Sequence, residues 1–415
     1  MKPLRNAPSD RPCRGRILAI GTLLLVGAAS PVLAKKGGKG GGGNGGGEDP
    51  PPPRSAPIHY SLTWLSEEPD SSILWDIDPD GVAVGQFRPF DSYADRYGII
   101  SFPGRTATDL GAIVAAGNHA GDPLPAGWAL TSVYTISDGL LVSGDVVGID
   151  GVTRCFAAQL SDDGSSTTVD WFRIHPAPAN ATQVYVQDAS EDGDDFVLDV
   201  RSTGPGGENV REIHRWSPRD TPEVSTWVTT LSSTLVATSV NNAGQVCWSV
   251  VNQSRDVFVD DPVLGILDVD SDPKLSSNGM DIAESGAVVG GFTSSRRGGF
   301  SPGIWRLGTG WQELSGTSRE KGFVAAVNSV EQVIGLEYET NRLFFHSNAD
   351  GLHPIDELVI GTTEDLARWT DTLYYLSSSM SAPDGTGYGK IAGHAVVAAG
   401  GNDHGFILTP VPVDP

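Results

Sequence analysis

The segment Met280-Asp-Ile-Ala-Glu-Ser-Gly-Ala-Val-Val-Gly290 is one of the clearest copies of a pattern that recurs along the chain. It consists of a short apolar strand, a tight turn that ends in glycine, and a second strand that also ends in glycine. Glycine suits the turn because hairpin turns need residues with a positive φ. The segment therefore predicts a β-hairpin.

Six further copies of this hairpin occur along the chain. They are Leu74–Gly85, Tyr134–Gly144, Val186–Asp199, Ala237–Cys247, Ala325–Gly335 and Met380–Gly393. The turn position is held by Gly81, Gly139, Gly193, Gly244, Gly286, Glu331 and Gly389, which are 42 to 58 residues apart. A repeat of this length, built from several strands, is typical of propeller blades.

Two outer strands complete each repeat. Third strands are predicted at Gly98–Phe102, Cys155–Leu160, Ile213–Trp216, Ile304–Leu307, Leu343–Phe345 and Gly405–Leu408, and fourth strands at Ala107–Gly111, Gly265–Val269, Trp311–Leu314 and His353–Leu358. Helical periodicity is weak, and only residues 363–368 predict a turn or two of helix. The sequence thus predicts an all-β fold, a β-propeller of seven four-stranded blades. A β-solenoid is the alternative, although its coils usually take only about 20–30 residues.

The two ends of the repeat region predict how the ring closes. The seventh copy stops after its third strand, and a lone strand of the fourth type, His59–Leu65, precedes the first copy. We therefore expect the N-terminal strand to complete the last blade, which removes the exposed strand edges of an open array. This closure places the first strand of every copy at the central channel.

The N-terminal region has the pattern of an export signal. Residues 1–34 combine a basic start, an uncharged and mostly apolar run at Ile17–Ala29, and small residues before a predicted cleavage site at Ala34. Residues 35–57 form a Gly- and Pro-rich linker, and residues 58–415 form the propeller domain. The expected location is therefore secreted, either extracellular or at the cell surface.

The repeat resembles the HAF-repeat family of bacterial extracellular proteins, whose unit reads I-N-x-x-G-x-V-x-G followed by H-A-F. The closest segments are Val240–Val246 and His404–Val411, and the resemblance extends over about residues 58–412. It implies secretion and a propeller, and it supplies no catalytic residues. Many relatives end in a membrane-sorting tail, and the end at Pro415 without one predicts a free or differently tethered protein.

The composition excludes several classes of function. The formal charge of −23 argues against nucleic-acid binding, and no apolar run beyond the N-terminus is long enough to span a membrane. No hydrolase, zinc-protease or P-loop motif is present, so we predict no catalytic residues, no metal site and no cofactor. Calcium binding at Asp76–Gly81 or Asp188–Asp199 stays an alternative, since both segments space carboxylates as calcium loops do.

Binding through loops is the predicted function. The loops between second and third strands share one face with the loops between blades, and Arg and aromatic side chains on loops are common in recognition. The predicted ligand-binding residues are Arg88, Asp91, Tyr93, Arg96, Tyr97, Arg296, Arg297, Tyr338 and Arg342. We expect a monomeric binding or scaffolding propeller for an extracellular protein or glycan. The alternative is a secreted polysaccharide hydrolase or lyase with carboxylates at the channel mouth.

The cysteines of the propeller are predicted to be reduced. Cys155 lies in the third strand of the second copy and Cys247 in the second strand of the fourth copy. A whole blade separates them, which exceeds the Cα–Cα distance of about 7 Å that a disulfide allows. We therefore expect two buried thiols.

Overall fold

The computed structural model describes residues 58–412 apart from 66–69, 90–94, 118, 221–223, 232–233, 252–254, 270–275, 294–299, 315–321, 339, 371 and 398–401. The predicted signal segment, the linker and the predicted site residues Asp91, Tyr93, Arg296 and Arg297 lie outside the described residues.

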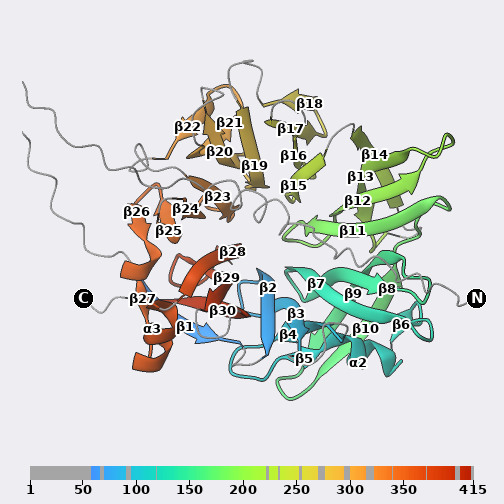
Figure 1. Ribbon diagram of the computed structural model, residues 1–415, viewed down its shortest axis with the longest axis horizontal. Helices are drawn as coiled ribbons and strands as arrows, with labels where there is room; N and C mark the ends of the chain where they lie inside the picture. Colours follow the sequence, from blue (N-terminus) through green and yellow to red (C-terminus); the bar gives the residue numbers. More distant parts are fainter. Residues whose placement is uncertain are drawn as a thin grey trace, which may run out of the picture. The chain divides into compact units, whose positions relative to one another are not determined.

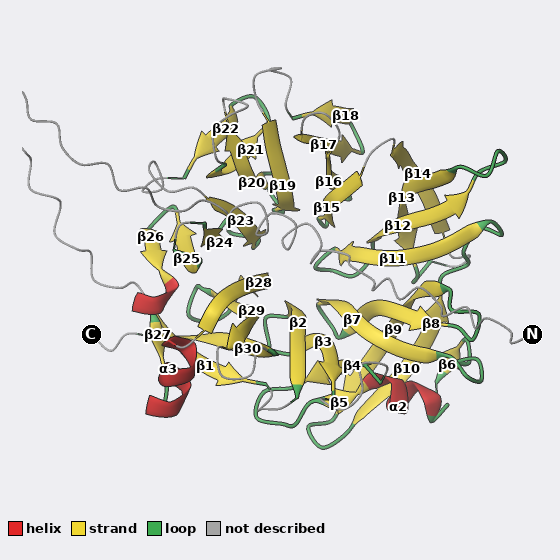
Figure 2. Cartoon of the chain, viewed as in Figure 1, coloured by secondary structure: helices red, strands yellow, loops and turns green. Residues whose placement is uncertain are grey.

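Seven antiparallel sheets form a ring of blades, which confirms the predicted seven-bladed propeller (Figures 1 and 2). Blade 1 comprises β2 (Ser71–Ile77), β3 (Ala83–Arg88), β4 (Tyr97–Ser101) and β5 (Thr108–Asp109). Blade 2 comprises β7 (Ala129–Ser137), β8 (Leu141–Val147), β9 (Thr153–Asp162) and β10 (Thr167–Ile174). Blade 3 comprises β11 (Ala181–Ala189), β12 (Phe196–Thr203), β13 (Asn209–Ser217) and β14 (Val224–Leu231).

The remaining blades repeat this strand order. Blade 4 comprises β15 (Thr234–Val240), β16 (Val246–Val251), β17 (Arg255–Asp261) and β18 (Gly265–Asp268). Blade 5 comprises β19 (Ser276–Ile282), β20 (Val288–Thr293), β21 (Ser301–Arg306) and β22 (Gly310–Glu313). Blade 6 comprises β23 (Gly322–Val327), β24 (Val333–Glu337), β25 (Arg342–Ser347) and β26 (Gly351–Pro354), and blade 7 comprises β28 (Thr372–Pro383), β29 (Gly389–Val397), β30 (Asp403–Val411) and β1 (His59–Trp64).

The strand β1 closes the ring as predicted. It pairs antiparallel with β30 over six residue pairs, from His59 opposite Val411 to Trp64 opposite Phe406. Tyr60 and Leu62 of β1 are buried, and the Tyr60 ring lies 6.2 Å from the ring of Phe345 in blade 6. The N-terminal strand is therefore both hydrogen-bonded and packed into the last blade.

The first hairpin adopts the turn that its sequence predicts in blades 1 to 6. The anchor residues have φ between 61° and 91°, and Glu331 takes this left-handed conformation where other blades use glycine. Its carboxylate accepts hydrogen bonds from Arg306 and from Ser285 Oγ, which hold the turn. The predicted anchor Gly389 is wrong: in the longer turn of blade 7, Gly387 has the positive φ of 84° and donates to the carbonyl of Asp384.

Two predicted fourth strands are shorter than expected. In blade 1, β5 gives way at once to the helix α2 (Leu110–Ala115), because Asp109 caps the backbone N–H of Ala112 and Leu110 and Val114 are buried. In blade 6, β26 is followed by the 3-10 turn η1 (Ile355–Glu357). The predicted helix is confirmed as α3 (Thr363–Thr370).

Extra strands cover the outer edges of two blades. The strand β6 (Ala120–Gly121) pairs parallel with β10, and β27 (Val359–Ile360) pairs parallel with β1. Both lie in the long inter-blade insertions that also carry α2 and α3, on the outside of the ring (Figure 2). The insertions therefore contribute to the walls of the blades.

The core consists of apolar clusters that join neighbouring blades. Val84 and Ile100 of blade 1, for example, share a cluster with Val142 and Phe156 of blade 2. No helix within the described ranges is long and apolar enough to cross a membrane.

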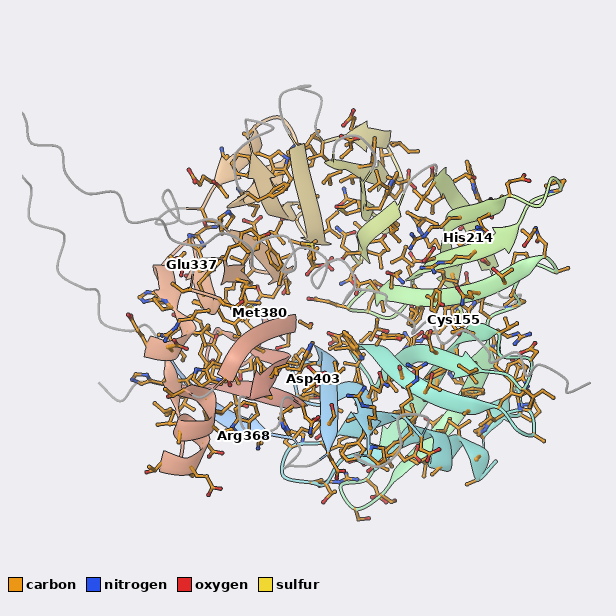
Figure 3. All side chains as sticks on the ribbon, in the orientation of Figure 1. Cys155, His214, Glu337, Arg368, Met380 and Asp403 are labelled. Atoms are coloured by element: carbon orange, nitrogen blue, oxygen red, sulfur yellow. The ribbon has the colours of Figure 1, made fainter. Side chains whose placement is uncertain are left out.

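Both cysteines of the propeller are free and buried, as predicted. Cys155 lies between blades 2 and 3 (Figure 3). Cys247 packs with residues of blades 4 and 5. Burial raises the pKa of the Cys247 thiol, which disfavours the reactive thiolate.

We expect a chain that begins at Lys35 to show no thiol reactive with Ellman's reagent while it is folded, because both thiols are buried. The same chain in 6 M guanidinium should show two. Fewer than two thiols in denaturant would contradict the free-thiol assignment.

Candidate functional site

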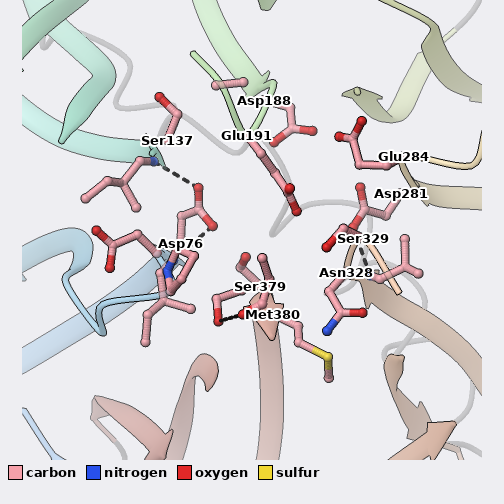
Figure 4. Close-up of a pocket in the computed structure, with 18 of the residues that line it drawn as sticks. Asp76, Ser137, Asp188, Glu191, Asp281, Glu284, Asn328, Ser329, Ser379 and Met380 are labelled. Atoms are coloured by element: carbon pink, nitrogen blue, oxygen red, sulfur yellow. Dashed lines mark hydrogen bonds between the residues drawn. The ribbon is translucent and has the colours of Figure 1, made fainter. Parts of the chain in front are cut away.

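A pocket lies at the mouth of the central channel, where the first strands end and their hairpins begin. It has a volume of about 80 Å³, and residues of all seven blades line it (Figure 4). Seven of the lining residues are acidic: Asp76, Asp78, Asp138, Asp188, Glu191, Asp281 and Glu284. No Lys or Arg is among the described residues that line it. We call this pocket the acidic mouth.

Three of these carboxylates bridge neighbouring blades. Asp76 of blade 1 accepts the N–H of Ile136 in blade 2 at 2.9 Å, and also its neighbour Ile77 N–H at 2.9 Å. Asp281 of blade 5 accepts the N–H of Val327 in blade 6 at 3.0 Å. The carboxylates thus satisfy backbone donors at the channel and tie inner strands together.

The third bridge has the same form. Asp188 of blade 3 accepts the N–H of Val240 in blade 4 at 3.2 Å and the hydroxyl of Ser239 at 2.6 Å. The Ser239 hydroxyl also lies 2.6 Å from a carboxylate oxygen of Asp281. Asp residues of blades 1, 3 and 5 therefore anchor the inner strands of blades 2, 4 and 6, and their role is structural.

Glu191 differs from these three. Its side chain points toward the centre of the pocket (Figure 4), and its carboxylate accepts no hydrogen bond from any residue in the described part of the chain. Burial raises the pKa of this carboxyl to about 7, and the nearby negative charges of Glu284, Asp138, Asp281 and Asp76 add to the effect. Glu191 thus carries a proton much of the time near neutral pH.

The pKa values of two other carboxyls at the rim, Asp78 and Glu284, are shifted in the same direction. Burial raises the pKa of Asp78 to about 6, although the N–H of Val82 donates to it at 2.8 Å. Burial also raises the pKa of Glu284, whose two oxygens accept the N–H of Asn242 at 3.1 Å each. Removing these groups from water disfavours their charges, so a bound cation would stabilise the ionised forms.

The predicted site residues that lie within the described ranges are at the strand ends opposite to the acidic mouth. Arg88 ends β3, and Arg96 and Tyr97 lie at the start of β4, whereas the acidic mouth lies where β2 ends and β3 begins. Tyr338 packs on Phe323 at 5.7 Å between ring centroids, and Arg342 pairs with Asp356. The residues of blades 1 and 6 are separated by blade 7, so the structure does not bring them into one pocket.

The described residues contain no group of three or more His, Cys, Asp or Glu side chains arranged to hold a metal ion. In the two segments considered for calcium, Asp76 and Asp188 form the bridges between blades. Asp199 is fully buried in ion pairs with Arg201 at 3.0 Å and Arg211 at 2.6 Å. Sequence spacing alone did not reveal these partners, because all of them except Arg201 lie on other strands.

Fold and site together define a seven-bladed β-propeller with an acidic channel mouth. No family model and no curated protein matches this chain. Among solved structures it is similar to puromycin hydrolase, with 13% identity, a TM-score of 0.45, and coverage of 81% of this chain and 50% of that chain. It therefore spans about half the length of puromycin hydrolase.

Two other solved structures that are similar to this protein have shorter chains than it has. The virginiamycin B lyase from Staphylococcus aureus has 9% identity and a TM-score of 0.40, with 84% of this chain and 99% of that chain covered. The β-propeller domain of the Trilobed protease from Pyrococcus furiosus has 12% identity and a TM-score of 0.40, with 68% and 83% covered. At these identities the likeness concerns the fold alone.

Proposed function

We propose that this protein is a secreted binding propeller that takes a positively charged group of its ligand at the acidic mouth. The observation that carries the proposal is the Glu191 carboxyl, which points into a pocket lined by seven acidic residues and accepts no hydrogen bond from the described residues. The extracellular setting rests on the sequence pattern of residues 1–34.

An organic cation fits this mouth better than a metal ion. Metal ions need several ligands converging at about 2.0–2.6 Å, and the described carboxylates are not grouped in that way. An ammonium or guanidinium group accepts separate carboxylates at hydrogen-bond distance, and a volume of about 80 Å³ holds one such group. The ligand is therefore a protein or glycan segment that bears a Lys, an Arg or an amino group.

A second candidate function is hydrolysis of a polysaccharide or elimination from it, and this reaction would also use Glu191. A carboxyl with a pKa of about 7 suits a general acid, and glycosidases raise one carboxyl in this way. Release of reducing or unsaturated ends from an amino-group-bearing polysaccharide, lost in Glu191→Gln, would establish it.

Calorimetric titration with tetralysine in 150 mM salt tests the binding function. Lysine side chains stay charged between pH 6 and pH 8, whereas Glu191 ionises over this interval. A bound cation lowers the pKa of Glu191, so binding should strengthen at least threefold as pH rises from 6 to 8. Glu191→Gln should weaken binding at pH 8 about tenfold and remove most of the pH dependence.

The matched control is Glu313→Gln, which removes the same charge from an exposed position on the outer strand β22. It should change the affinity by less than twofold. Equal losses in the two variants would show that tetralysine responds only to the overall negative charge, and would overturn the assignment to the acidic mouth.

A further inference from the structure

A second, larger cavity lies between blade 7 and blade 1, which are neighbours in the ring (Figure 1). Its volume is about 630 Å³. Leu65 and Ile407 line it on the side of blade 7, and Phe87, Tyr97 and Ile99 line it on the side of blade 1. We call it the wedge cavity. Volumes of about 300–1,000 Å³ with mostly apolar linings are usual for small-molecule sites.

The packing at this seam explains why the cavity is there. Counted over the residues that the structure describes, the buried cluster between blades 7 and 1 has five members, against sixteen in the cluster between blades 1 and 2. Five more apolar residues beside it are only partly buried: Leu65, Phe87, Tyr97, Ala107 and Ile407. All five line the wedge cavity. Protein interiors are normally close-packed, so this seam leaves apolar surface that a ligand can cover.

The charged groups of the lining, which are Lys390, Arg105 and the carboxylate Asp80, argue against an anionic ligand. Lys390 donates to the carbonyl of Pro79 and lies 3.4 Å from the Asp384 carboxylate. Arg105 pairs with Asp162 at 2.7 Å. Both cations are therefore neutralised by the protein itself, and an anionic ligand would have to compete with these carboxylates.

The aromatic groups indicate a ligand with rings. Phe87 and Tyr97 stack with their centroids 5.3 Å apart and an interplanar angle of 30°. Aromatic side chains favour offset or edge contacts with further rings. The hydroxyl groups of Thr63, Ser101 and Thr409 supply a few hydrogen-bonding positions along the wall.

We propose that the wedge cavity is a binding site for an uncharged aromatic small molecule, separate from the acidic mouth. Tyr97, which the sequence places among the candidate ligand-binding residues, belongs to this site. The site does not depend on the proposed function of the acidic mouth, because the two cavities share no lining residue.

Fluorescence titration of the full chain with N-phenyl-1-naphthylamine, an uncharged aromatic probe, tests this proposal. We expect saturable binding with one site per chain. Thr409→Trp and Ile407→Trp each place a large side chain in the cavity and should weaken binding at least tenfold. Ile266→Trp, at an exposed position on β18 of blade 4, is the matched control and should change the affinity by less than twofold.

Melting temperatures within a few degrees of the unchanged protein would show that the Trp variants fold. Glu191→Gln should leave probe binding unchanged, which separates this site from the acidic mouth. No saturable binding, or equal binding by the filled variants and the control, would overturn the proposal. Binding that appears only after deletion of residues 35–53 would also overturn it, by showing that the chain's own linker fills the cavity.

Discussion

A chain that lacks β1 is expected not to fold. Deletion of residues 59–64 removes six residue pairs with β30 and two buried side chains, Tyr60 and Leu62. It also exposes one edge of β30 and the apolar surface that β1 covers, and open edges favour aggregation. We expect loss of the cooperative thermal transition in circular dichroism and recovery of the protein mainly as aggregate.

Deletion of residues 35–53 is the control for this experiment, because that segment precedes the propeller and its sequence is a Gly- and Pro-rich linker. It should change the melting temperature by no more than a few degrees. A strand deletion that melts at the same temperature as the full chain would contradict closure by β1.

A cross-link tests the same closure in a protein that folds. Ser61 lies directly opposite Thr409 across the pair of strands. Antiparallel partners lie about 4.5–5.5 Å apart at Cα, which suits a disulfide. The double variant Ser61→Cys with Thr409→Cys should oxidise to an intramolecular disulfide and should lose its added stability on reduction. Persistence of both added thiols in the oxidised folded protein would argue against this register.

Asp281→Ala is expected to be the most destabilising single change at the acidic mouth. The carboxylate accepts hydrogen bonds from Ile282 N–H at 2.9 Å and Val327 N–H at 3.0 Å, and one of its oxygens lies 2.6 Å from Ser239 Oγ. Its loss leaves backbone donors without partners between blades 5 and 6. The free energy of unfolding should fall by about 2–4 kcal/mol, measured by urea denaturation.

Removal of one negative charge from the acidic mouth acts in the opposite direction, because the neighbouring carboxylates repel one another. At Asp281 the lost hydrogen bonds outweigh the relief of repulsion, so the substitution lowers the free energy of unfolding. Each hydrogen bond to a charged group contributes about 1.5–3 kcal/mol. Glu191 accepts no hydrogen bond from the described residues, so the burial of its carboxylate and the repulsion from its neighbours determine how a substitution changes the stability.

Glu191→Gln is therefore the matched control for Asp281→Ala. The pKa of Glu191 is about 7 in the folded protein and near 4.5 in the unfolded chain, so the folded state binds the proton more tightly. Its contribution to stability is fully present below pH 4.5 and is lost as pH rises through about 7. Glu191→Gln should therefore raise the melting temperature at pH 8 and change it little at pH 4.5. Destabilisation equal to that of Asp281→Ala would contradict the division into structural and ligand-binding carboxylates.

The blades and their closure were predictable from the amino-acid sequence alone. Alternation of apolar residues with period two and a turn that needs a positive φ are local features, and they recur at Gly81, Gly244 and Gly286. The last copy lacks a fourth strand, and a single strand of that type precedes the first copy. The sequence therefore also predicted that this strand completes the last blade. Local prediction was less accurate where tertiary packing competes with it, as at α2, where buried Leu110 and Val114 replace the end of a predicted strand.

The positions of the candidate sites follow from the packing of the blades and could not be predicted from the sequence. The carboxylates of the acidic mouth come from separate repeats. The sequence of one repeat does not show at which end of the channel the side chains of the other repeats lie. The backbone N–H groups that Asp76, Asp188 and Asp281 bridge to are on other blades, so two residues of the segments that resemble calcium loops in the sequence, Asp76 and Asp188, serve as bridges. The wedge cavity depends on how completely two blades pack together, a property of their facing surfaces that strand periodicity does not determine.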